Sequence, residues 1–430
     1  MTNRDRTAAG AILRALFDAA LAAADPRQAI EQRIPAPVRG RTVLVGAGKA
    51  SAAMAHAFET AWSGTLEGLV VTRYGHSIPC DQVEIVEAGH PVPDVAGERA
   101  ARRILDLARS LGPEDQLVFL ASGGGSALLS LPAPGLILDD KQAVTRALLR
   151  SGATITEINA VRKHLSAVKG GRLAAAAAPA RIVTLAISDV PGDDPAVIAS
   201  GHTVPDPTTC ADARAVLAKY RIEGPPSVIA HLAAAMEETP KPGDAIFDRA
   251  RFELVASPQA ALQAAVAIAQ QRNFIPIVLS DRIEGEARQV GLVHAGIALQ
   301  LRAGQFRVGD LLVTPPAVLL SGGETTVTVT GAGRGGRNVE FLLALAVALG
   351  GADGISALAC DTDGIDGTED NAGAILYPDS LARAAACGIS AQAALAHNDA
   401  YGFFAALGDL VVTGPTLTNV NDFRAVLVLD

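Results

Sequence analysis

A glycine-rich run that carries two arginines and an amide is the most chemically suggestive stretch of the chain. It extends from Gly331 to Asn338 and directly precedes an apolar, helix-like run, Val339 to Leu349. Glycines allow tight turns that bring backbone N–H groups close to a ligand, and a helix beginning there directs its positive end to the same place. Arg334 and Arg337 could each bind a phosphate or carboxylate through paired hydrogen bonds. The alternative is a surface turn with solvated arginines.

Two further glycine turns follow β-like runs, and each could cradle an anion with its backbone N–H groups. The first contains Gly46, Gly48 and Lys49; the second contains Ser122, Gly123, Gly124, Gly125 and Ser126. The first lacks the Walker pattern, because Ala50 follows the lysine, and it lacks the dinucleotide fingerprint, because Ser51 replaces the third glycine. In the second, Leu128 occupies the place of a glycine that a hydrolase nucleophile elbow needs. Plain strand-to-helix turns remain the alternative for both.

Carboxylates after β-like runs are the candidates for proton or metal chemistry. Asp189 follows the run Arg181–Ile187, and the carboxyl ends of strands in open α/β sheets are where ligands bind. It could accept a hydroxyl proton or hold Mg²⁺, whereas Asp193 and Asp194 are expected to cap the next helix. The segment from Asp361 to Asp366 could form a Mg²⁺ or hydroxyl site, or a cluster of Asx turns.

A basic stretch stands out within an acidic protein. If it is helical, Arg162, Ser166 and Lys169 share one face and could bind a carboxylate or phosphate. A solvated face is the alternative. The four cysteines form no Cys-x-x-Cys pair, so we expect reduced thiols of a cytoplasmic protein and neither zinc nor a disulfide framework.

Composition and pattern favour an α/β fold with two domains. The chain has 430 residues, of which 49% are hydrophobic, and uncharged β-like runs alternate with helical stretches such as Pro258–Arg272. The proline-rich segment Gly224–Asp244 suggests a joint, which predicts domains at 1–240 and 241–430. A net charge of −9 excludes a general nucleic-acid surface. No apolar run of membrane-spanning length is apparent, and the N-terminal amphipathic stretch is expected to be a helix.

These motifs, taken in order, resemble the glycerate 2-kinase family, also called class II glycerate kinases or the MOFRL family. The resemblance covers nearly the whole chain. It rests on the blocks already described and on further blocks in the same order, which are Gly89–Asp94, Asn159–Ser166, Ser188–Asp194, Ser321–Thr326, Asp363–Gly367, Gly408–Thr416 and Thr418–Asp422. The chain departs from the family pattern at His202, Val339 and Leu417, which puts acceptor selectivity in question more than kinase activity.

The resemblance implies a larger Rossmann-like N-terminal domain and a smaller α/β C-terminal MOFRL domain, with the active site in the cleft. It also implies transfer of the γ-phosphoryl of ATP to the C2 hydroxyl of D-glycerate. Lys49, Asp189 and Arg337 are then the expected catalytic residues, and Asp189 and Asp363 the expected Mg²⁺ ligands. The expected binding residues are Gly46, Gly48, Ser122–Ser126, Arg162, Asn338 and Asp361.

Two other functions were weighed against this expectation. A hydroxypyruvate reductase dependent on NAD(P)H needs a dinucleotide fingerprint that no turn here completes. A non-catalytic sensor of nucleotides or sugar acids would not need Lys49, Asp189 and Arg337 together. We therefore expect ATP, Mg²⁺ and D-glycerate as the small-molecule partners, with no nucleic-acid or membrane partner and with a homodimer left open. We also expect Arg337→Ala to lose activity without a change in melting temperature.

Overall fold

The computed structural model describes residues 3–429 and divides the chain into two compact units. The N-terminal unit comprises Pro26–Val255, and the C-terminal unit comprises the residues up to Asp25 together with those from Ala256 onward. The chain therefore changes unit twice, and its first helix belongs to the C-terminal unit. The expected division at residue 240 is wrong on both counts.

The N-terminal unit is built on a six-stranded sheet in the order β3-β2-β1-β4-β5-β6. Its strands are β1 (Thr42–Ala47), β2 (Glu67–Arg73), β3 (Val83–Ala88), β4 (Gln116–Ala121), β5 (Arg181–Ile187) and β6 (Ala250–Ala256). The first five are parallel, with Val43 opposite Glu67 and Leu117. The strand order reverses beside β1, as in doubly wound dinucleotide-binding folds, so the expected Rossmann-like arrangement is confirmed.

Helices cover both faces of this sheet because its strands are apolar on both sides. Val43 and Val45 pack with α4 (Val95–Arg109) and α8 (Arg172–Ala177), while α3 (Ser51–Ala61) contacts β1, β2 and β4. Short helices α2 (Pro26–Glu31) and α5 (Gly125–Leu128) complete the layer contacts.

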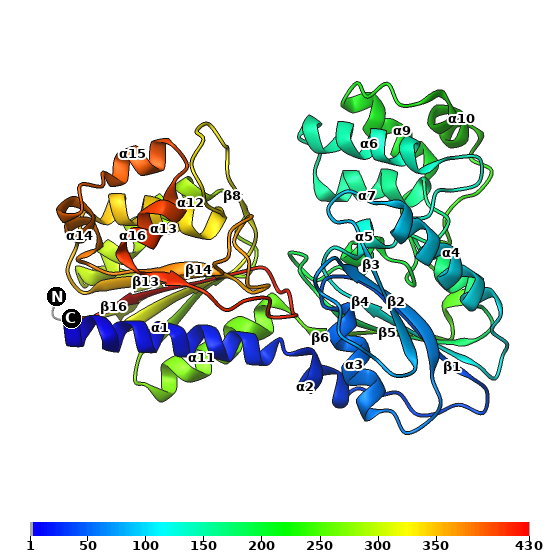
Figure 1. Ribbon diagram of the computed structural model, residues 1–430, viewed down its shortest axis with the longest axis horizontal. Helices are drawn as coiled ribbons and strands as arrows, with labels where there is room; N and C mark the ends of the chain where they lie inside the picture. The colour runs from blue at the N-terminus through cyan, green and yellow to red at the C-terminus, as the bar shows by residue number, and fades with distance from the viewer. Residues whose placement is uncertain (1–2, 430) are drawn as a thin grey trace. The chain divides into compact units, whose positions relative to one another are not determined.

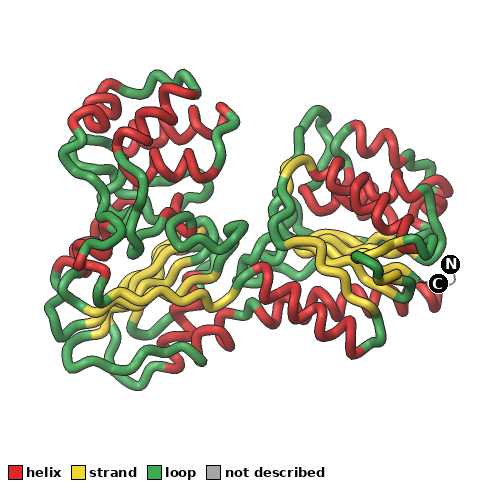
Figure 2. The backbone as a smooth tube through the Cα atoms, turned by 180° about the vertical axis from the view of Figure 1, so that it is seen from behind, coloured by secondary structure: helices red, strands yellow, loops and turns green. Residues whose placement is uncertain are grey.

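A second group of helices in the N-terminal unit has its own small core (Figure 2). It consists of α6 (Leu138–Ser151), α7 (Ile155–His164), α9 (Cys210–Lys219) and α10 (Pro226–Ala234). A buried ion pair between Lys163 and Asp206, 3.2 Å apart, lies beside it. The proline-rich segment expected to join domains lies here, because Pro226 begins α10 and Val228 and Leu232 bury their side chains in this core.

The C-terminal unit is a mixed sheet with the strand order β15-β14-β13-β16-β11-β7. The strands are β7 (Ile275–Ser280), β11 (Ala317–Ser321), β13 (Ile355–Asp361), β14 (Gly373–Leu376), β15 (Leu410–Val411) and β16 (Asp422–Val428). Two small pairs stand apart from it, β8 (Gly285–Glu286) with β12 (Thr325–Thr326) and β9 (Phe306–Val308) with β10 (Leu311–Val313).

Helices cover both faces of the C-terminal sheet (Figure 1). One face carries α1 (Asn3–Ala23) and α11 (Pro258–Gln271). The other carries α12 (Ala287–Arg302), α13 (Arg337–Leu349), α14 (Ser380–Ala386), α15 (Ala391–Ala396) and α16 (Ala400–Leu407). Two 3₁₀ turns, η1 (Ile198–Ser200) and η2 (Ala245–Phe247), belong to the N-terminal unit.

The N-terminal stretch is a helix, as expected from the sequence, but the expectation that no stretch has membrane-spanning length and apolarity is wrong. The stretch Asp5–Glu31 is long and apolar enough to cross a membrane by length and composition alone. Its apolar stripe, however, is buried within the C-terminal unit: Leu13, Leu16 and Phe17 are fully buried, and the Phe17 ring lies 5.8 Å from that of Phe423. An amphipathic core helix passes the same composition test.

Candidate functional site

Two of the three glycine turns are joined at the point where the strand order of the N-terminal sheet reverses. The backbone N–H of Lys49 donates to the carbonyl oxygen of Gly123 (2.8 Å), and that of Ala50 donates to Ser122 Oγ (3.1 Å). Both turns leave the carboxyl ends of neighbouring parallel strands, β1 and β4. This edge of a doubly wound sheet is where such folds bind ligands, so the structure brings Lys49 and the serine–glycine turn together.

The backbone of these turns requires glycine at two positions. Gly48 has φ +149°, and a Cβ atom there would lie 2.0 Å from Ser122 Oγ. Gly124 has φ +80°, and its Cβ would lie 2.9 Å from the His90 ring and 3.5 Å from Lys49 Cγ. Lys49 and His90 therefore flank Gly124 closely, and the turn keeps its shape only without side chains.

Two of the expected binding glycines have a packing role. A Cβ atom on Gly46 would lie 2.6 Å from the carbonyl oxygen of Leu120, and one on Gly125 would lie 2.6 Å from that of Ala47. Both positions face neighbouring backbone, which explains their residue type without a ligand.

The two serines of the second turn are held by hydrogen bonds. Ser122 is fully buried, and Ser126 Oγ lies 2.7 Å from Ser200 Oγ, which in turn donates to Asn159 Oδ1 (3.0 Å). These partners are hydroxyl, amide and main-chain groups, which do not activate a serine as a nucleophile. The hydrolase alternative has no support in this geometry.

Asp189 follows β5 and so lies at the same edge of the sheet as both turns. Strand β5 pairs with β4 in parallel from Gln116 opposite Arg181 onward, and Asp189 is partly buried two residues beyond its end. Asp194 accepts a hydrogen bond from the backbone N–H of Ala196 (2.9 Å), which is a local turn contact. The expected role as a helix cap is wrong, because Val197 is the cap residue of the 3₁₀ turn that follows.

A strongly basic cavity adjoins Ser126. Its walls are formed by Pro91, Pro93, Ser126, Ala127, Ser130, Lys141, Thr145, Arg162 and Lys169. Lys141 and Lys169 are 5% and 1% exposed, and their ammonium groups donate to the carbonyl oxygens of Leu131 (3.3 Å) and Leu129 (2.8 Å). Burial lowers the pKa of Lys141 to about 7 and the pKa of Lys169 well below its usual value.

The expected helical face is wrong, although two of its members do meet. Helix α7 ends at His164, so Ser166 and Lys169 lie beyond it, and Ser166 Oγ donates to Leu131 O instead. Arg162 and Lys169 nevertheless line the same cavity. Sequence reasoning missed Lys141, which comes from α6, because no local spacing links it to the other two cations.

In the C-terminal unit, Arg337 lies among carboxylates. Its Nε donates to Asp422 (2.7 Å), its Nη2 to Asp361 (2.7 Å) and its Nη1 to Glu324 (3.1 Å). Burial alone would lower the pKa of Arg337, but these carboxylates outweigh it and hold the pKa well above the usual value. In this structure the guanidinium organises an acidic cluster.

A carboxylate also occupies the N-terminus of α13. Asp366 accepts from the backbone N–H groups of Asn338 (3.0 Å) and Val339 (2.9 Å). The side-chain amide of Asn338 donates to Asp366 (3.3 Å) and to Asp422 (2.8 Å). The expectation that this helix end directs its free N–H groups at a substrate anion is therefore wrong, because the chain supplies the anion itself.

The glycines before α13 serve close packing. A Cβ on Gly331 or Gly333 would lie 2.2 Å or 2.5 Å from the carbonyl oxygen of His397. Arg334 pairs with Glu369 and lies 4.5 Å from the ring centre of Tyr401. The Arg334 side chain is still 62% exposed, so the expectation of a solvated arginine agrees with the structure.

The segment after β13 contains two Asx turns. Asp361 Oδ1 accepts from the backbone N–H of Asp363, and Asp363 Oδ1 accepts from that of Ile365, each at 3.0 Å. Local turn geometry therefore accounts for one oxygen of each carboxylate, as one of the two alternatives predicted.

One group of potential metal ligands was not foreseen from the sequence. The ligand atoms of His164, Cys210 and Glu238 lie within 4.8 Å of one another. Glu238 also accepts from Lys241 Nζ (3.3 Å) and from the backbone N–H of Cys210 (2.9 Å). The ammonium group of Lys241 therefore already supplies a positive charge next to these three side chains.

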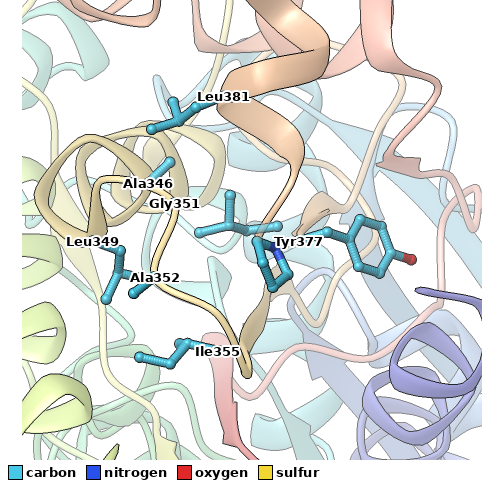
Figure 3. A pocket seen from close by; sticks show the side chains of 9 residues that line it. Ala346, Leu349, Gly351, Ala352, Ile355, Tyr377 and Leu381 are labelled. Atoms are coloured by element: carbon cyan, nitrogen blue, oxygen red, sulfur yellow. The ribbon is translucent and has the colours of Figure 1, made fainter. Parts of the chain in front are cut away.

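An apolar cavity lies at the C-terminal end of α13 (Figure 3). It is lined by Ala346, Leu349, Gly351, Ala352, Ile355, Leu376, Tyr377, Pro378 and Leu381. No lining residue is charged, and Figure 3 shows the Tyr377 hydroxyl directed away from the other labelled side chains. These residues offer packing surface and no chemistry for an anionic substrate.

Comparison with known proteins agrees with this architecture. Residues 12–233 match a domain of unknown function, DUF4147, and residues 317–422 match the MOFRL family. A D-glycerate 2-kinase from Thermotoga maritima is 42% identical over 94% of this chain and 94% of its own length. The chain belongs to the glycerate 2-kinase (MOFRL) family.

Two further members of the family show how its names and its fold relate to this chain. A putative hydroxypyruvate reductase from Agrobacterium vitis is 56% identical over 97% of this chain and 94% of its own length. The crystal structure of a glycerate kinase from Thermotoga maritima superposes with a TM-score of 0.86, at 40% identity, over 96% of this chain and 98% of that one. The fold described above is thus that of the glycerate kinases.

Proposed function

We propose that this chain is a glycerate 2-kinase that converts D-glycerate and ATP into 2-phosphoglycerate and ADP. The observation that carries the proposal is the edge of the N-terminal sheet at which its strand order reverses. There the Lys49 turn is bonded to Gly123 and Ser122, and three cations line a cavity beside Ser126. Relatives named as glycerate kinases support the choice of reaction.

The reaction forms one bond and breaks another at phosphorus. The C2 hydroxyl oxygen attacks the γ-phosphorus, the bond from that phosphorus to the β–γ bridging oxygen breaks, and the hydroxyl proton passes to a base. ADP leaves with the electron pair of the broken bond. Catalysis of such a transfer depends on positioning the two reactants and on stabilising negative charge.

We assign four roles at this edge and in the cavity beside it. Lys49 stabilises the charge on the transferred phosphoryl group, and the turn Ser122–Ser126 receives the nucleotide phosphates. Asp189 orients the C2 hydroxyl and accepts its proton. Arg162 binds acceptor or nucleotide charge.

For Arg337 and Asn338 in the C-terminal unit we propose a positioning role in place of the expected catalytic and binding roles. Arg337 and Asn338 hold Asp361, Asp366 and Asp422 in fixed positions. We propose that they orient these carboxylates within the C-terminal unit.

Magnesium fits this chain as an ion held chiefly by the nucleotide. Among residues 3–429, no three carboxylates converge closely enough to form an all-protein cage, and Mg²⁺ in kinases needs only one or two carboxylates besides the phosphates. Asp189 is the candidate ligand in the N-terminal unit and Asp363 the candidate in the C-terminal unit. When bound, the ion neutralises phosphate charge.

A hydroxypyruvate reductase is the second candidate, because relatives bear that name. In a dinucleotide fold, the third glycine of the fingerprint allows close helix–strand packing. Here Ser51 takes that place, and its hydroxyl lies between two carbonyl oxygens that can accept its proton, Gly48 O (2.6 Å) and Val71 O (2.8 Å). This geometry fixes the turn differently from a dinucleotide site.

We also propose a cytoplasmic location, because α1 buries its apolar stripe within the protein.

The enzymatic proposal is tested by giving the purified protein D-glycerate, ATP and Mg²⁺, and separately hydroxypyruvate with NADH or NADPH. ADP release that depends on D-glycerate is the expected result. Oxidation of NAD(P)H without any ADP release would establish the reductase instead.

A further inference from the structure

We propose that the cavity lined by Lys141, Arg162 and Lys169 binds the carboxylate of the acceptor and so selects hydroxy acids over neutral polyols. This subsite rests on the proposed kinase function, since it presupposes an acid as the acceptor. For brevity these three residues are called the cation triad.

The charge of the triad is the first argument. None of its members forms an ion pair within 4.0 Å with a carboxylate of residues 3–429, and both lysines are almost fully buried. The nearby Glu98 pairs with Arg102 at 3.2 Å. Burying ammonium groups without a counter-charge is costly, so without a bound anion burial favours the neutral amines of the two lysines. A bound anion would supply the missing counter-charge and favour their charged forms.

The remaining walls suit a small hydroxylated acid. Ser126, Ser130 and Thr145 contribute hydroxyl groups, while Pro91 and Ala127 contribute apolar surface. A hydroxy acid in this cavity is matched at both of its functional groups. The triad binds its carboxylate, and the hydroxyl side chains lie close to its own hydroxyl group. Because Ser126 ends the glycine turn, an acid held here has its C2 hydroxyl near the proposed phosphoryl site.

The size of the cavity favours an acid over a nucleotide. The volume of the cavity is about 20 Å³, which is room for one small group such as a carboxylate and not for a whole nucleotide. A three-carbon acid needs far less room than a nucleoside triphosphate. The phosphate groups of the nucleotide are therefore the alternative source of the anion, to be distinguished by experiment.

Proton linkage provides a signature that a purely structural role would not produce. Burial first, and then the charge of Arg162, hold the pKa of Lys141 at about 7, while Glu98 opposes them. Lys169, the second lysine of the triad, and His202 beside it are buried and have lowered pKa values. A bound carboxylate favours the protonated ammonium, so binding at pH 7 should take up roughly half a proton at Lys141.

The first test compares D-glycerate with its neutral amide, D-glyceramide, as acceptors for Lys141→Met and Lys169→Met. Arg146→Met, at an exposed position of the same helix α6, is the matched control. We expect each triad variant to lose roughly 100-fold in kcat/KM for D-glycerate, with little further loss for D-glyceramide and an unchanged KM for ATP. The control should behave as the wild type.

Several results would overturn the subsite. Equal losses with both acceptors, or unchanged selectivity, would contradict carboxylate binding, and a raised KM for ATP would assign the triad to nucleotide phosphates. The second test needs no variant: calorimetric titration of the wild-type protein with D-glycerate at pH 7, in buffers of different ionisation enthalpy. Proton uptake supports the subsite, and binding without uptake, or no binding, counts against it. Failure of the wild type to phosphorylate D-glycerate would instead overturn the proposed function.

Discussion

The backbone N–H of Lys49 donates a 2.8 Å hydrogen bond to the carbonyl oxygen of Gly123. This contact joins the turn after β1 to the turn after β4, which are 74 residues apart in sequence and adjacent where the strand order reverses. It places a lysine whose backbone is fixed beside a glycine turn that admits no side chain at Gly124. Such a preorganised arrangement is what charge stabilisation in phosphoryl transfer requires.

Lys49→Met keeps the length of the side chain and removes its charge. We expect kcat to fall by roughly 100- to 1,000-fold, the usual effect of removing one charge-stabilising group, with a melting temperature close to that of the wild type. Lys219→Met, at a lysine that is 61% exposed and pairs with Glu157, is the control and should keep full activity. A small loss of kcat at Lys49 would argue that another cation stabilises the phosphoryl group.

The variant Asp189→Asn distinguishes between the two possible roles of Asp189, as a general base and as a metal ligand. Loss of a general base should lower kcat by roughly 100- to 10,000-fold at every Mg²⁺ concentration. Loss of a metal ligand should instead be partly rescued as Mg²⁺ is raised. Asp194→Asn serves as the control, because an asparagine oxygen can still accept the hydrogen bond from Ala196. Wild-type kinetics in Asp189→Asn would remove this residue from the site.

Arg337→Met should destabilise the C-terminal unit as well as impair activity. The change leaves Asp361 and Asp422, 4% and 2% exposed, without one of their cationic partners. Breaking such an arrangement costs about 3 kcal/mol or more, measurable by denaturant unfolding. This revises the expectation from sequence that the arginine could be lost without a change in melting temperature.

The double variant Arg337→Met with Asp361→Asn supplies the corresponding check. Neutralising one of the two carboxylates that lose Arg337 as a partner should recover part of the lost stability. If the single variant melts as the wild type does, Arg337 does not organise the acidic cluster.

Asp366 should make stability depend on pH. Burial raises its pKa to about 6, against the opposing hydrogen bonds from Asn338 and Val339. A carboxyl whose pKa is raised on folding stabilises the protein below its unfolded pKa and loses that contribution as pH rises through its folded pKa. The contribution should fall by roughly 2 kcal/mol between pH 4 and pH 7.

The measurement is the difference in unfolding free energy between the wild type and Asp366→Asn at several pH values. Groups that titrate in both proteins cancel in this difference. The advantage of the wild type should be larger at pH 4 than at pH 7. A difference that does not change with pH would show that Asp366 titrates near the usual value.

Much of the N-terminal unit could be predicted from sequence because its signals are local. Arg181–Ile187 was expected as a strand with these limits, and the turns around Lys49 and Ser122 stand directly after apolar strands. Parallel strands bring their carboxyl ends to one edge of the sheet. Two turns that each follow such a strand are therefore expected to lie together.

The contacts of the C-terminal unit could not be predicted in the same way. The sequence around Arg337 shows an arginine among glycines, but Asp366 and Asp422 reach it from 29 and 85 residues away. An anion-binding helix end and one already capped by its own carboxylate have the same local sequence. The predicted domain boundary was wrong for a related reason. The prolines of this segment predicted a break between domains, yet proline is favourable at the first turn of a helix, and Pro226 begins α10.

The most direct test of the account is the ³¹P NMR spectrum of the purified protein incubated with D-glycerate, ATP and Mg²⁺. Phosphorylation at the C2 hydroxyl couples phosphorus to a single proton, so the product should give a phosphomonoester doublet that grows as the signals of ADP appear. A triplet would show transfer to the terminal hydroxyl instead. A spectrum in which ATP remains unchanged would contradict the kinase assignment itself.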